Sequence, residues 1–290
     1  MNPVVRNLRF EIDESVPQYW LAGRKSVTIF LDNLSVFFPA GERFFVRAVR
    51  AHQAFVKEDG LMQEVRAFCG QEGVHGREHE RYNELLRRNY PIEAMERRVQ
   101  AILDRVTRRA PDLGQLGVTC ALEHFTALLG GMLLRDPRLL EGAHPAMQAL
   151  WRWHAAEENE HKTVAYDVYR AAGGAYPMRV WTMIGATAIF WAKVIEQQAR
   201  MMHESDILFS ASEWAALGRY LFVEPGGMVP LLRHYFEYYR PDFHPSQIDS
   251  NELLDQWRAE YDASPVYAMS AAAARSGARG RGTSGVVPAT

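Results

Sequence analysis

Two short stretches of the chain place glutamate and histidine at the spacing of one helical turn. In "WHAAEENEH", His154, Glu158 and His161 lie four and three residues apart, and in "QEGVHGREH", Glu72 and His75 lie three apart. Residues three, four and seven positions apart share one face of an α-helix, because each residue turns the helix by about 100°. Carboxylate oxygens and imidazole nitrogens are typical ligands of transition metals. Each stretch therefore offers a Glu-x-x-His motif for metal binding.

Two further segments carry a single acid among apolar residues, Glu42 in "PAGERFF" and Glu123 in "CALEHFTALL". Four-helix dinuclear carboxylate proteins use one Glu from each of two helices and a Glu-x-x-His from each of the other two. The 30 positions from Glu42 to Glu72 and the 35 from Glu123 to Glu158 suit helical hairpins, and the 51 between the pairs leave room for a crossover. We therefore predict an all-α, ferritin-like four-helix bundle with a long crossover and additional C-terminal helices.

Four buried carboxylates would require compensation, because an unpaired buried charge strongly destabilises a fold. Two divalent cations cancel four carboxylates, and neutral imidazoles add nitrogen ligands without adding charge. We expect two metal ions, with iron favoured and manganese or zinc as alternatives. An isolated Glu-x-x-His is usually a solvated pair, so the prediction depends on the whole set. The predicted ligands are Glu42, Glu72, His75, Glu123, His154, Glu158 and His161.

Other polar residues on the same helices are candidates for catalytic or supporting roles. His79 shares the face of His75 and is expected to hydrogen-bond near the site rather than to bind metal. Tyr82, seven residues after His75, is a candidate hydrogen-bond donor near the site, although most tyrosines on a helix face only pack. Glu157 is a further supporting candidate. Glu160 points to another face and is expected to be a solvated charge.

The chain is long enough for one large helical domain, and we divide it into three parts. Residues 1–38 mix short β-branched runs with helix breakers and are expected to form an extended arm. Residues 39–262 hold the helical domain, which begins at Pro39 because proline suits the first helical turn. One long helix is predicted over 144–174. Residues 263–290 are small, glycine-rich and mildly basic, which indicates a disordered tail.

Composition argues against several classes of function. A net charge of −2 gives no general attraction for nucleic acid. The most apolar stretch, 180–192, is shorter than the roughly 20 residues that span a bilayer, so we predict a buried helix, with an interfacial helix as the alternative. Cys69 and Cys120 suit reduced core residues, and the N-terminus lacks the apolar run of a signal peptide. We expect a cytoplasmic protein without membrane association.

Together with "NLSVFFPAGERFFVRAVR" and "WRWHAAEENEHKTVAYDVY", these motifs resemble the bacterial family of predicted metal-dependent hydrolases in the ferritin-like superfamily, over roughly residues 5–240. The histidine pattern is also distantly similar to that of three-histidine di-iron N-oxygenases. This second resemblance implies two groups of ligands. They are Glu42, Glu72 and His75 with a bridging carboxylate at one metal, and Glu123, His154, Glu158 and His161 at the other.

Two enzymatic functions fit the ligand set. The first is oxygen activation by a di-iron site for oxidation of a small organic substrate, which would require an electron donor; mixed carboxylate and imidazole ligands suit iron. The alternative is two-metal hydrolysis of an ester, amide or phosphoryl bond, which the family resemblance favours. Iron storage or a purely structural site is a third class, which the additional helices disfavour because they could cover a substrate pocket. Their aromatic residues could wall a pocket for an apolar or aromatic substrate, although packing against the bundle is the more common role of such residues. The sequence indicates no oligomeric state.

Overall fold

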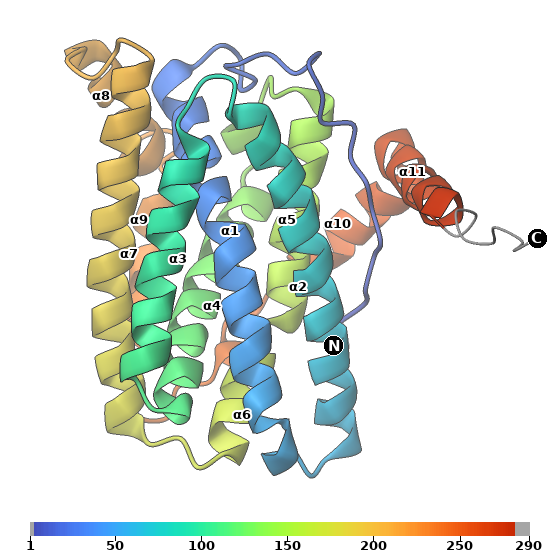
Figure 1. Cartoon of the computed structure of the whole chain (residues 1–290), viewed down its shortest axis with the longest axis vertical. Helices are drawn as coiled ribbons and strands as arrows, with labels where there is room; N and C mark the ends of the chain where they lie inside the picture. Colours follow the sequence, from blue (N-terminus) through green and yellow to red (C-terminus); the bar gives the residue numbers. More distant parts are fainter. Residues whose placement is uncertain (1–2, 282–290) are drawn as a thin grey trace, which may run out of the picture.

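The computed structural model describes residues 3–281, which form helices joined by short loops (Figure 1). Within that range there is no β-strand, only an isolated bridge between Leu21 and Ala143. The all-α class predicted from the sequence is confirmed. The helices are α1 (Lys25–His52), α2 (Asp59–Leu86), α3 (Ile92–Arg109), α4 (Asp112–Arg135), α5 (Pro145–His161), α6 (Val164–Ala171), α7 (Tyr176–Glu204), α8 (Ala211–Phe222), α9 (Met228–Glu237), α10 (Asn251–Ala263) and α11 (Pro265–Arg281).

Four long helices surround the centre of the molecule. α1 packs against α2 and α4, and α5 packs against the same two helices, so the four close a ring of contacts. α3 connects α2 to α4 and lies against α1 (Figure 1). Its buried residues, Ile92, Met95, Val99 and Leu103, recur every three or four positions and turn the charged residues outward. These contacts suit a four-helix bundle with a long crossover, and the ferritin-like topology stays a prediction.

The apolar interior divides into two clusters along these helices. One cluster contains Leu34 of α1 and Tyr82 of α2, and the other contains Phe44 of α1 and Phe68 of α2. Along these helices, buried glutamate and histidine residues lie between the members of the two clusters. The fold therefore encloses a polar layer between two apolar regions, where charges interact more strongly than in water.

The first helix begins at Lys25 and passes through Pro39 without ending there. Proline has no N–H, so Pro39 leaves the carbonyl of Ser35 without its helical partner. The side-chain amide of Asn83, on α2, donates to that carbonyl at 3.3 Å. The prediction that the helix begins at Pro39 is wrong, because a neighbouring helix supplies the hydrogen bond that proline removes. The extended arm therefore ends before Lys25 and is shorter than the predicted arm of residues 1–38.

The single helix predicted over 144–174 is divided into α5 and α6 by a turn at Lys162 and Thr163. Both residues keep backbone angles close to those of a helix. The ammonium group of Lys162 donates to the hydroxyl of Ser250 at 2.7 Å and also to the carbonyl of Ile248. At this turn, Lys162 therefore connects the end of α5 to the segment that precedes α10.

The apolar stretch predicted to be a buried helix belongs to a longer and largely exposed one. α4 and α7 are both apolar and long enough to span a membrane, by length and composition alone. The most apolar window of α4 is 72% buried within the molecule, but that of α7 is only 17% buried. The prediction of a buried helix is wrong, because α7 packs on the outside of α1 and α4 (Figure 1). Trp181, for example, is 71% exposed.

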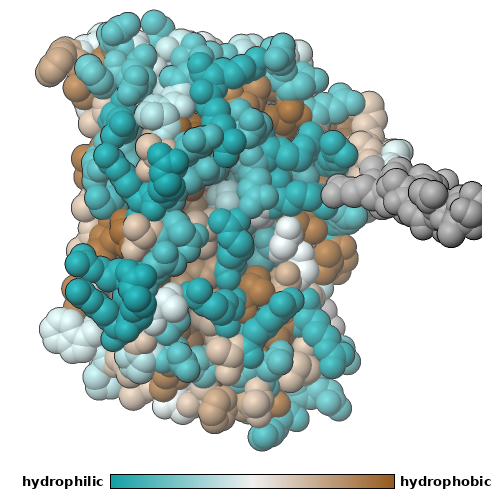
Figure 2. Space-filling model, viewed as in Figure 1, coloured by the Kyte–Doolittle hydropathy of each residue, from teal (hydrophilic) through white to brown (hydrophobic). Residues whose placement is uncertain are grey.

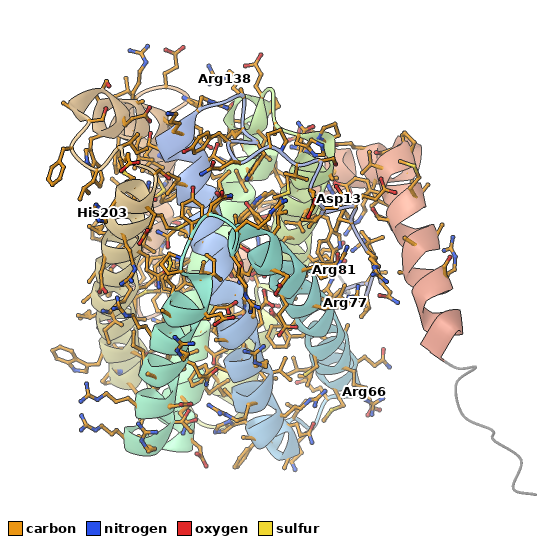
Figure 3. The ribbon with its side chains drawn as sticks, turned by 45° about the horizontal axis from the view of Figure 1, so that its top comes forward. Asp13, Arg66, Arg77, Arg81, Arg138 and His203 are labelled. Carbon is orange, nitrogen blue, oxygen red and sulfur yellow. The ribbon has the colours of Figure 1, made fainter. Side chains whose placement is uncertain are left out.

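The N-terminal arm runs along the bundle in an extended form before it enters α1 (Figure 1). The guanidinium group of Arg77, on α2, donates to the side chain of Asn7 at 2.8 Å. Figure 3 shows Arg77 and Arg81 on the side of α2 along which the arm passes. The backbone N–H of Phe10 donates to the carboxylate of Glu78 at 3.0 Å. The arm is therefore part of the folded structure.

The tail predicted to be disordered from residue 263 instead continues as α11. Tyr267 of this helix is buried, and its hydroxyl donates to the carbonyl of Ala149 on α5 at 3.1 Å. An aromatic side chain anchored in this way explains why the segment folds despite its small, glycine-rich composition. The remainder of the predicted tail, residues 282–290, lies outside the described residues.

Candidate metal centre

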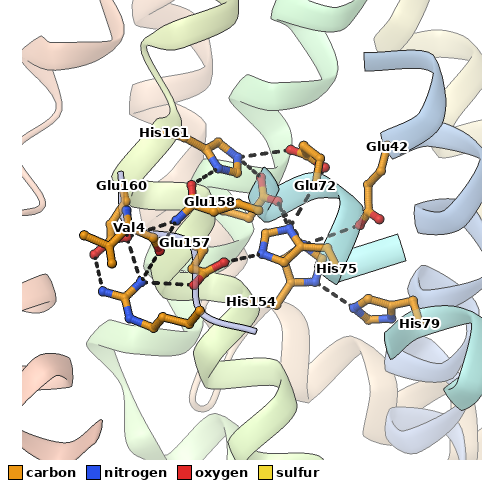
Figure 4. A network of polar contacts seen from close by, with 12 residues as sticks. Val4, Glu42, Glu72, His75, His79, His154, Glu157, Glu158, Glu160 and His161 are labelled. Carbon is orange, nitrogen blue, oxygen red and sulfur yellow. Dashed lines mark hydrogen bonds and ion pairs between the residues drawn. The ribbon is translucent and has the colours of Figure 1, made fainter. Parts of the chain in front are cut away.

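The seven residues predicted to bind metal converge in the polar layer between the two apolar clusters (Figure 4). All are buried, with at most 4% of any of them exposed. The spacing of three or four residues within each helix turns them toward the same interior point. α1 supplies Glu42, α2 supplies Glu72 and His75, α4 supplies Glu123, and α5 supplies His154, Glu158 and His161.

The potential ligand atoms form two groups, and within each group they lie within 4.8 Å of one another. Such spacing allows one cation to be bound by each group. The first group is Glu42, His75 and His154, and the second is Glu72, Glu123, Glu158 and His161.

Two carboxylates lie between the groups. Oε1 of Glu158 is 2.9 Å from Nε2 of His154 and 3.5 Å from Nδ1 of His75. Its Oε2 is 3.6 Å from Nε2 of His161. Glu72 has one oxygen 4.0 Å from His75 and the other 3.2 Å from His161. A carboxylate that directs one oxygen to each group is arranged to bridge two cations, so the geometry identifies Glu72 and Glu158 as the bridging candidates.

His154 lies with Glu42 and His75, whereas the distant resemblance implied that it joins His161. The distance along α5 explains the difference. His154 and His161 are seven residues apart, a rise of about 10 Å, whereas metal–nitrogen bonds are about 2 Å long. The assignment of His154 to the group of His161 is therefore wrong. α5 contributes one histidine to each group, and the two histidines lie at different levels along the helix.

Each of the three histidines predicted to bind metal is oriented by a partner on its outer side. Nε2 of His75 is 3.0 Å from the carboxylate of Glu157, and Nδ1 of His161 is 2.9 Å from the side-chain oxygen of Gln71. The opposite nitrogens, Nδ1 of His75 and Nε2 of His161, make no hydrogen bond. Such outer partners fix the tautomer and direct the free nitrogen toward a metal.

His79 holds His154 through a directed chain of hydrogen bonds. Ser35 Oγ donates to Asn83 at 2.8 Å, so it accepts from Nδ1–H of His79, also at 2.8 Å. Nε2 of His79 then accepts from Nδ1–H of His154 at 2.7 Å. Burial, followed by the charge on His75, lowers the pKa of His154 to about 4. The neutral imidazole therefore presents the lone pair of Nε2 to the centre, as a metal ligand requires.

The carboxylates of the centre are not satisfied by the protein. Both oxygens of Glu42, Glu72 and Glu123 are buried without a hydrogen bond. Buried polar atoms in native proteins nearly always have partners. Gly76 leaves room for this set, because a Cβ at that position would lie 3.0 Å from Oε2 of Glu42. Oxygen and nitrogen ligands of this kind fit iron, manganese or zinc ions.

The pKa values of the same groups show how costly the uncompensated charges are. Burial, followed by the charge on Glu72, raises the pKa of Glu123 to about 8, and the same two causes raise the pKa of Glu42 well above its ordinary range. Burial opposes protonation of His75, but its contacts with carboxylates, Glu157 first, outweigh this and raise its pKa to about 10. A cation must displace these protons, so its affinity should rise with pH.

Tyr82 does not reach the ligands. Its hydroxyl donates to the carboxylate of Asp32 and accepts from Nε1 of Trp20 at 2.9 Å. Nε1 of Trp20 also lies 2.8 Å from Oδ1 of Asp32. The three side chains form a separate buried cluster, so the structure gives no support to the predicted role of Tyr82 near the site.

Glu160 is 6% exposed, so the prediction of a solvated charge is wrong. Its carboxylate accepts hydrogen bonds from Arg6 at 2.9 Å and from Gln71 at 3.1 Å. Arg6 also donates to Glu157 at 3.0 Å. Sequence reasoning missed both partners. Gln71 had a signal, because it precedes Glu72 directly, but Arg6 is 151 residues away from Glu157 and had none.

A narrow apolar crevice of about 30 Å³ reaches the centre at His154 and Glu158. No lysine or arginine is among the described residues that line it. The crevice therefore has room for a small apolar molecule beside the metal groups, whereas a charged molecule would lose its hydration there without compensation. Its apolar walls include Phe38, Leu129, Met132, Trp151 and Tyr220.

These observations define an all-helical protein with buried glutamates and histidines arranged as a candidate dinuclear metal centre. A comparison with protein families matches residues 4–249 to the family described as predicted metal-dependent hydrolase. The chain belongs to this family, as the resemblance of its motifs predicted. No curated protein and no solved structure matches the chain. Metal dependence is supported by the family description and by the geometry of the centre.

Proposed function

We propose that this protein is a two-metal hydrolase whose substrate is an ester or amide that carries an apolar group. The observation that carries the proposal is the set of buried ligand atoms without partners, arranged in two groups with Glu72 and Glu158 between them. Two divalent cations would neutralise the four carboxylates of this set. The family description supports hydrolysis as the type of reaction.

When bound, a pair of cations polarises a carbonyl group and lowers the pKa of a water molecule. The residues of the chain hold and orient the cations. His79 and Glu157 are each engaged with a ligand histidine, at 2.7 and 3.0 Å, so we assign them positioning roles in place of the predicted catalytic ones. Removing such a partner typically weakens metal binding by about 10- to 100-fold.

The crevice at His154 and Glu158 supports the choice of substrate. Its walls are apolar, so the part of the substrate nearest its mouth should be uncharged and apolar, while the crevice itself, at about 30 Å³, has room only for a small group. A phosphoryl substrate is disfavoured, because no cationic side chain among the described lining residues would compensate its charge. An ester or amide is neutral and can be desolvated at lower cost.

Oxygen activation by iron or manganese is a second candidate, in which the protein would oxidise a small organic substrate with the help of an electron donor. The specific observation in its favour is the size and polarity of the crevice, since about 30 Å³ of apolar space suits a small apolar gas molecule. Carboxylate and imidazole ligands also suit iron. This candidate uses the same residues as ligands.

The test compares protein loaded with zinc, manganese or, without air, ferrous iron. We expect two metal ions per chain and hydrolysis of p-nitrophenyl butyrate, which is lost with a chelator and in Glu158→Gln. Glu80→Gln is the matched control, because Glu80 lies on the same helix as Glu72 but is paired with Arg43 on the surface at 2.7 Å. Oxygen uptake by the iron form without ester turnover would favour the second candidate. Protein that binds no metal would contradict both.

A further inference from the structure

Large apolar side chains are exposed mainly on one region of the molecule, the segment from α7 to α9. Trp181, Ile195, Phe209, Phe222 and Phe236 are each more than half exposed. In Figure 2 brown and pale side chains interrupt the teal surface along the edge where α7 and α3 lie. Contiguous apolar surface of this kind usually marks a site of binding.

A groove is hollowed into this surface between α3, α4 and α7, with a volume of about 430 Å³. Val118 and Leu122 of α4 line it together with Leu103 of α3 and Ile189 of α7. The volume lies within the range of about 300 to 1,000 Å³ that is usual for small-molecule sites. The groove is therefore large enough for a ligand, and most of its lining is apolar.

Three cationic residues line the same groove, Arg105 and Arg109 on α3 and Lys193 on α7. Lys193 is paired with Glu196, so α7 itself supplies the counter-ion of this lysine. Arg105 and Arg109 form no ion pair with any residue between 3 and 281, and no acidic residue lines the groove within that range. One end of an apolar groove thus carries two positive charges that lack a counter-ion.

We propose that this groove binds a single-chain amphipathic anion, a long-chain carboxylate. The hydrocarbon chain lies along α7, and the carboxylate lies at Arg105 and Arg109, which offer paired N–H donors to an anion of this shape. The lining of α7 from Trp181 to Lys193 extends over about 18 Å, enough for a chain of this kind.

The structure favours a single chain over a lipid bilayer. A bilayer needs a projecting apolar surface, whereas this surface is concave. Glu196 of α7 is paired with Arg98 at 3.0 Å, and this exposed ion pair lies on the same side of the molecule. Charges at that position would be expensive to bring into hydrocarbon.

Gly185 provides a direct test, because it lines the groove and a Cβ at this position would meet no atom within 4 Å. Gly185→Leu should therefore fill the groove without disturbing the fold, and leucine has a higher helix propensity than glycine. Gly218→Leu is the matched control, since a Cβ at Gly218 on α8 is equally unobstructed but lies outside the groove.

The experiment is calorimetric titration of the full chain with dodecanoate below its micelle concentration, with 1-dodecanol as the uncharged probe. We expect saturable binding of one dodecanoate per chain, at least tenfold weaker in Gly185→Leu and unchanged in Gly218→Leu. Arg105→Glu combined with Arg109→Glu should weaken dodecanoate binding at least tenfold and leave dodecanol binding unchanged. Circular dichroism and the melting temperature verify that each variant is folded.

Four results would overturn the proposal. One is the absence of dodecanoate binding, and another is binding that Gly185→Leu leaves intact. A third is sedimentation with vesicles of anionic phospholipid that dodecanoate does not displace, which would assign the surface to a bilayer. The fourth is a dimer that Gly185→Leu dissociates while dodecanoate does not bind, which would assign it to a second copy of the chain.

Discussion

The carboxyl group of Asp32 illustrates how single residues respond to this interior. It is fully buried, its Oδ1 accepts hydrogen bonds from Tyr82 and Trp20, and its Oδ2 has no partner. Burial outweighs the two hydrogen bonds and raises the pKa of Asp32 to about 7. In the unfolded chain an aspartate titrates near about 3.9. The folded state therefore holds an additional proton between these pH values, and the stability that it provides is lost as pH rises through 7.

Asp32→Asn should remove this pH dependence, because an amide does not titrate. Between pH 5 and pH 8 the free energy of unfolding of the wild type should fall by about 2 to 3 kcal/mol more than that of Asp32→Asn. Urea unfolding at the two pH values, with chelator present throughout, measures both changes. The other buried acids titrate in both proteins and cancel in the comparison. Parallel changes in the two proteins would contradict the raised pKa of Asp32.

At the scale of the helices, α1 and α2 depend on each other at Pro39. Asn83→Ala would leave the carbonyl of Ser35 without a donor, which should lower the free energy of unfolding by about 1 to 3 kcal/mol. Pro39→Ala restores a backbone N–H that can bond to that carbonyl. We therefore expect Asn83→Ala to be less destabilising, by about 0.5 kcal/mol or more, in a chain that already carries Pro39→Ala.

Urea unfolding of the wild type, the two single variants and the double variant closes this cycle. Asn83 also accepts from the hydroxyl of Ser35 at 2.8 Å, so part of its contribution should persist in the double variant. The difference between the two backgrounds in the free energy of unfolding lost on Asn83→Ala measures the hydrogen bond to Ser35 that is needed only because residue 39 is proline. If that cost is the same in both backgrounds, the amide of Asn83 does not replace the missing helical hydrogen bond.

The same helices show what the sequence could predict. Spacing within one helix is fixed by its geometry, so the residues of α2 and α5 that face the centre could be predicted from periodicity. Contacts between distant segments have no such signature, and the ion pair of Arg6 with Glu157 is one of them. The start of α1 was mistaken because the partner that tolerates Pro39 lies on another helix. The exposed position of α7 depends on packing, which composition does not determine.

At the scale of the whole molecule, one acid from each of four helices meets the others at the centre. Each helix is thereby held near like charges, which favours separation of the helices when no cation is present. Protonation relieves part of this strain, as the raised pKa values of Glu42 and Glu123 indicate. Bound cations would relieve it further and would connect all four helices at once. Stability of the molecule should therefore depend strongly on metal.

The double variant Glu42→Gln with Glu123→Gln separates two effects at pH 7, the repulsion between the buried acids and the stabilisation by bound cations. Without metal it should melt at a higher temperature than the wild type, because glutamine avoids the unfavourable ionisation equilibrium of the two buried acids. Zinc at a hundred times its dissociation constant should stabilise the wild type by about 2.7 kcal/mol, since it binds the folded state, and should leave the double variant nearly unchanged.

The order of the two melting temperatures should therefore be reversed, or their difference much reduced, when zinc replaces chelator. Differential scanning calorimetry of both proteins in each condition measures this. Glu80→Gln should follow the wild type throughout, because Glu80 is exposed and lies outside the centre. Equal stabilisation of the wild type and the double variant by zinc would show that the metal binds elsewhere. In that case neither Glu42 nor Glu123 would be a ligand, and neither group of the proposed centre would bind zinc as described.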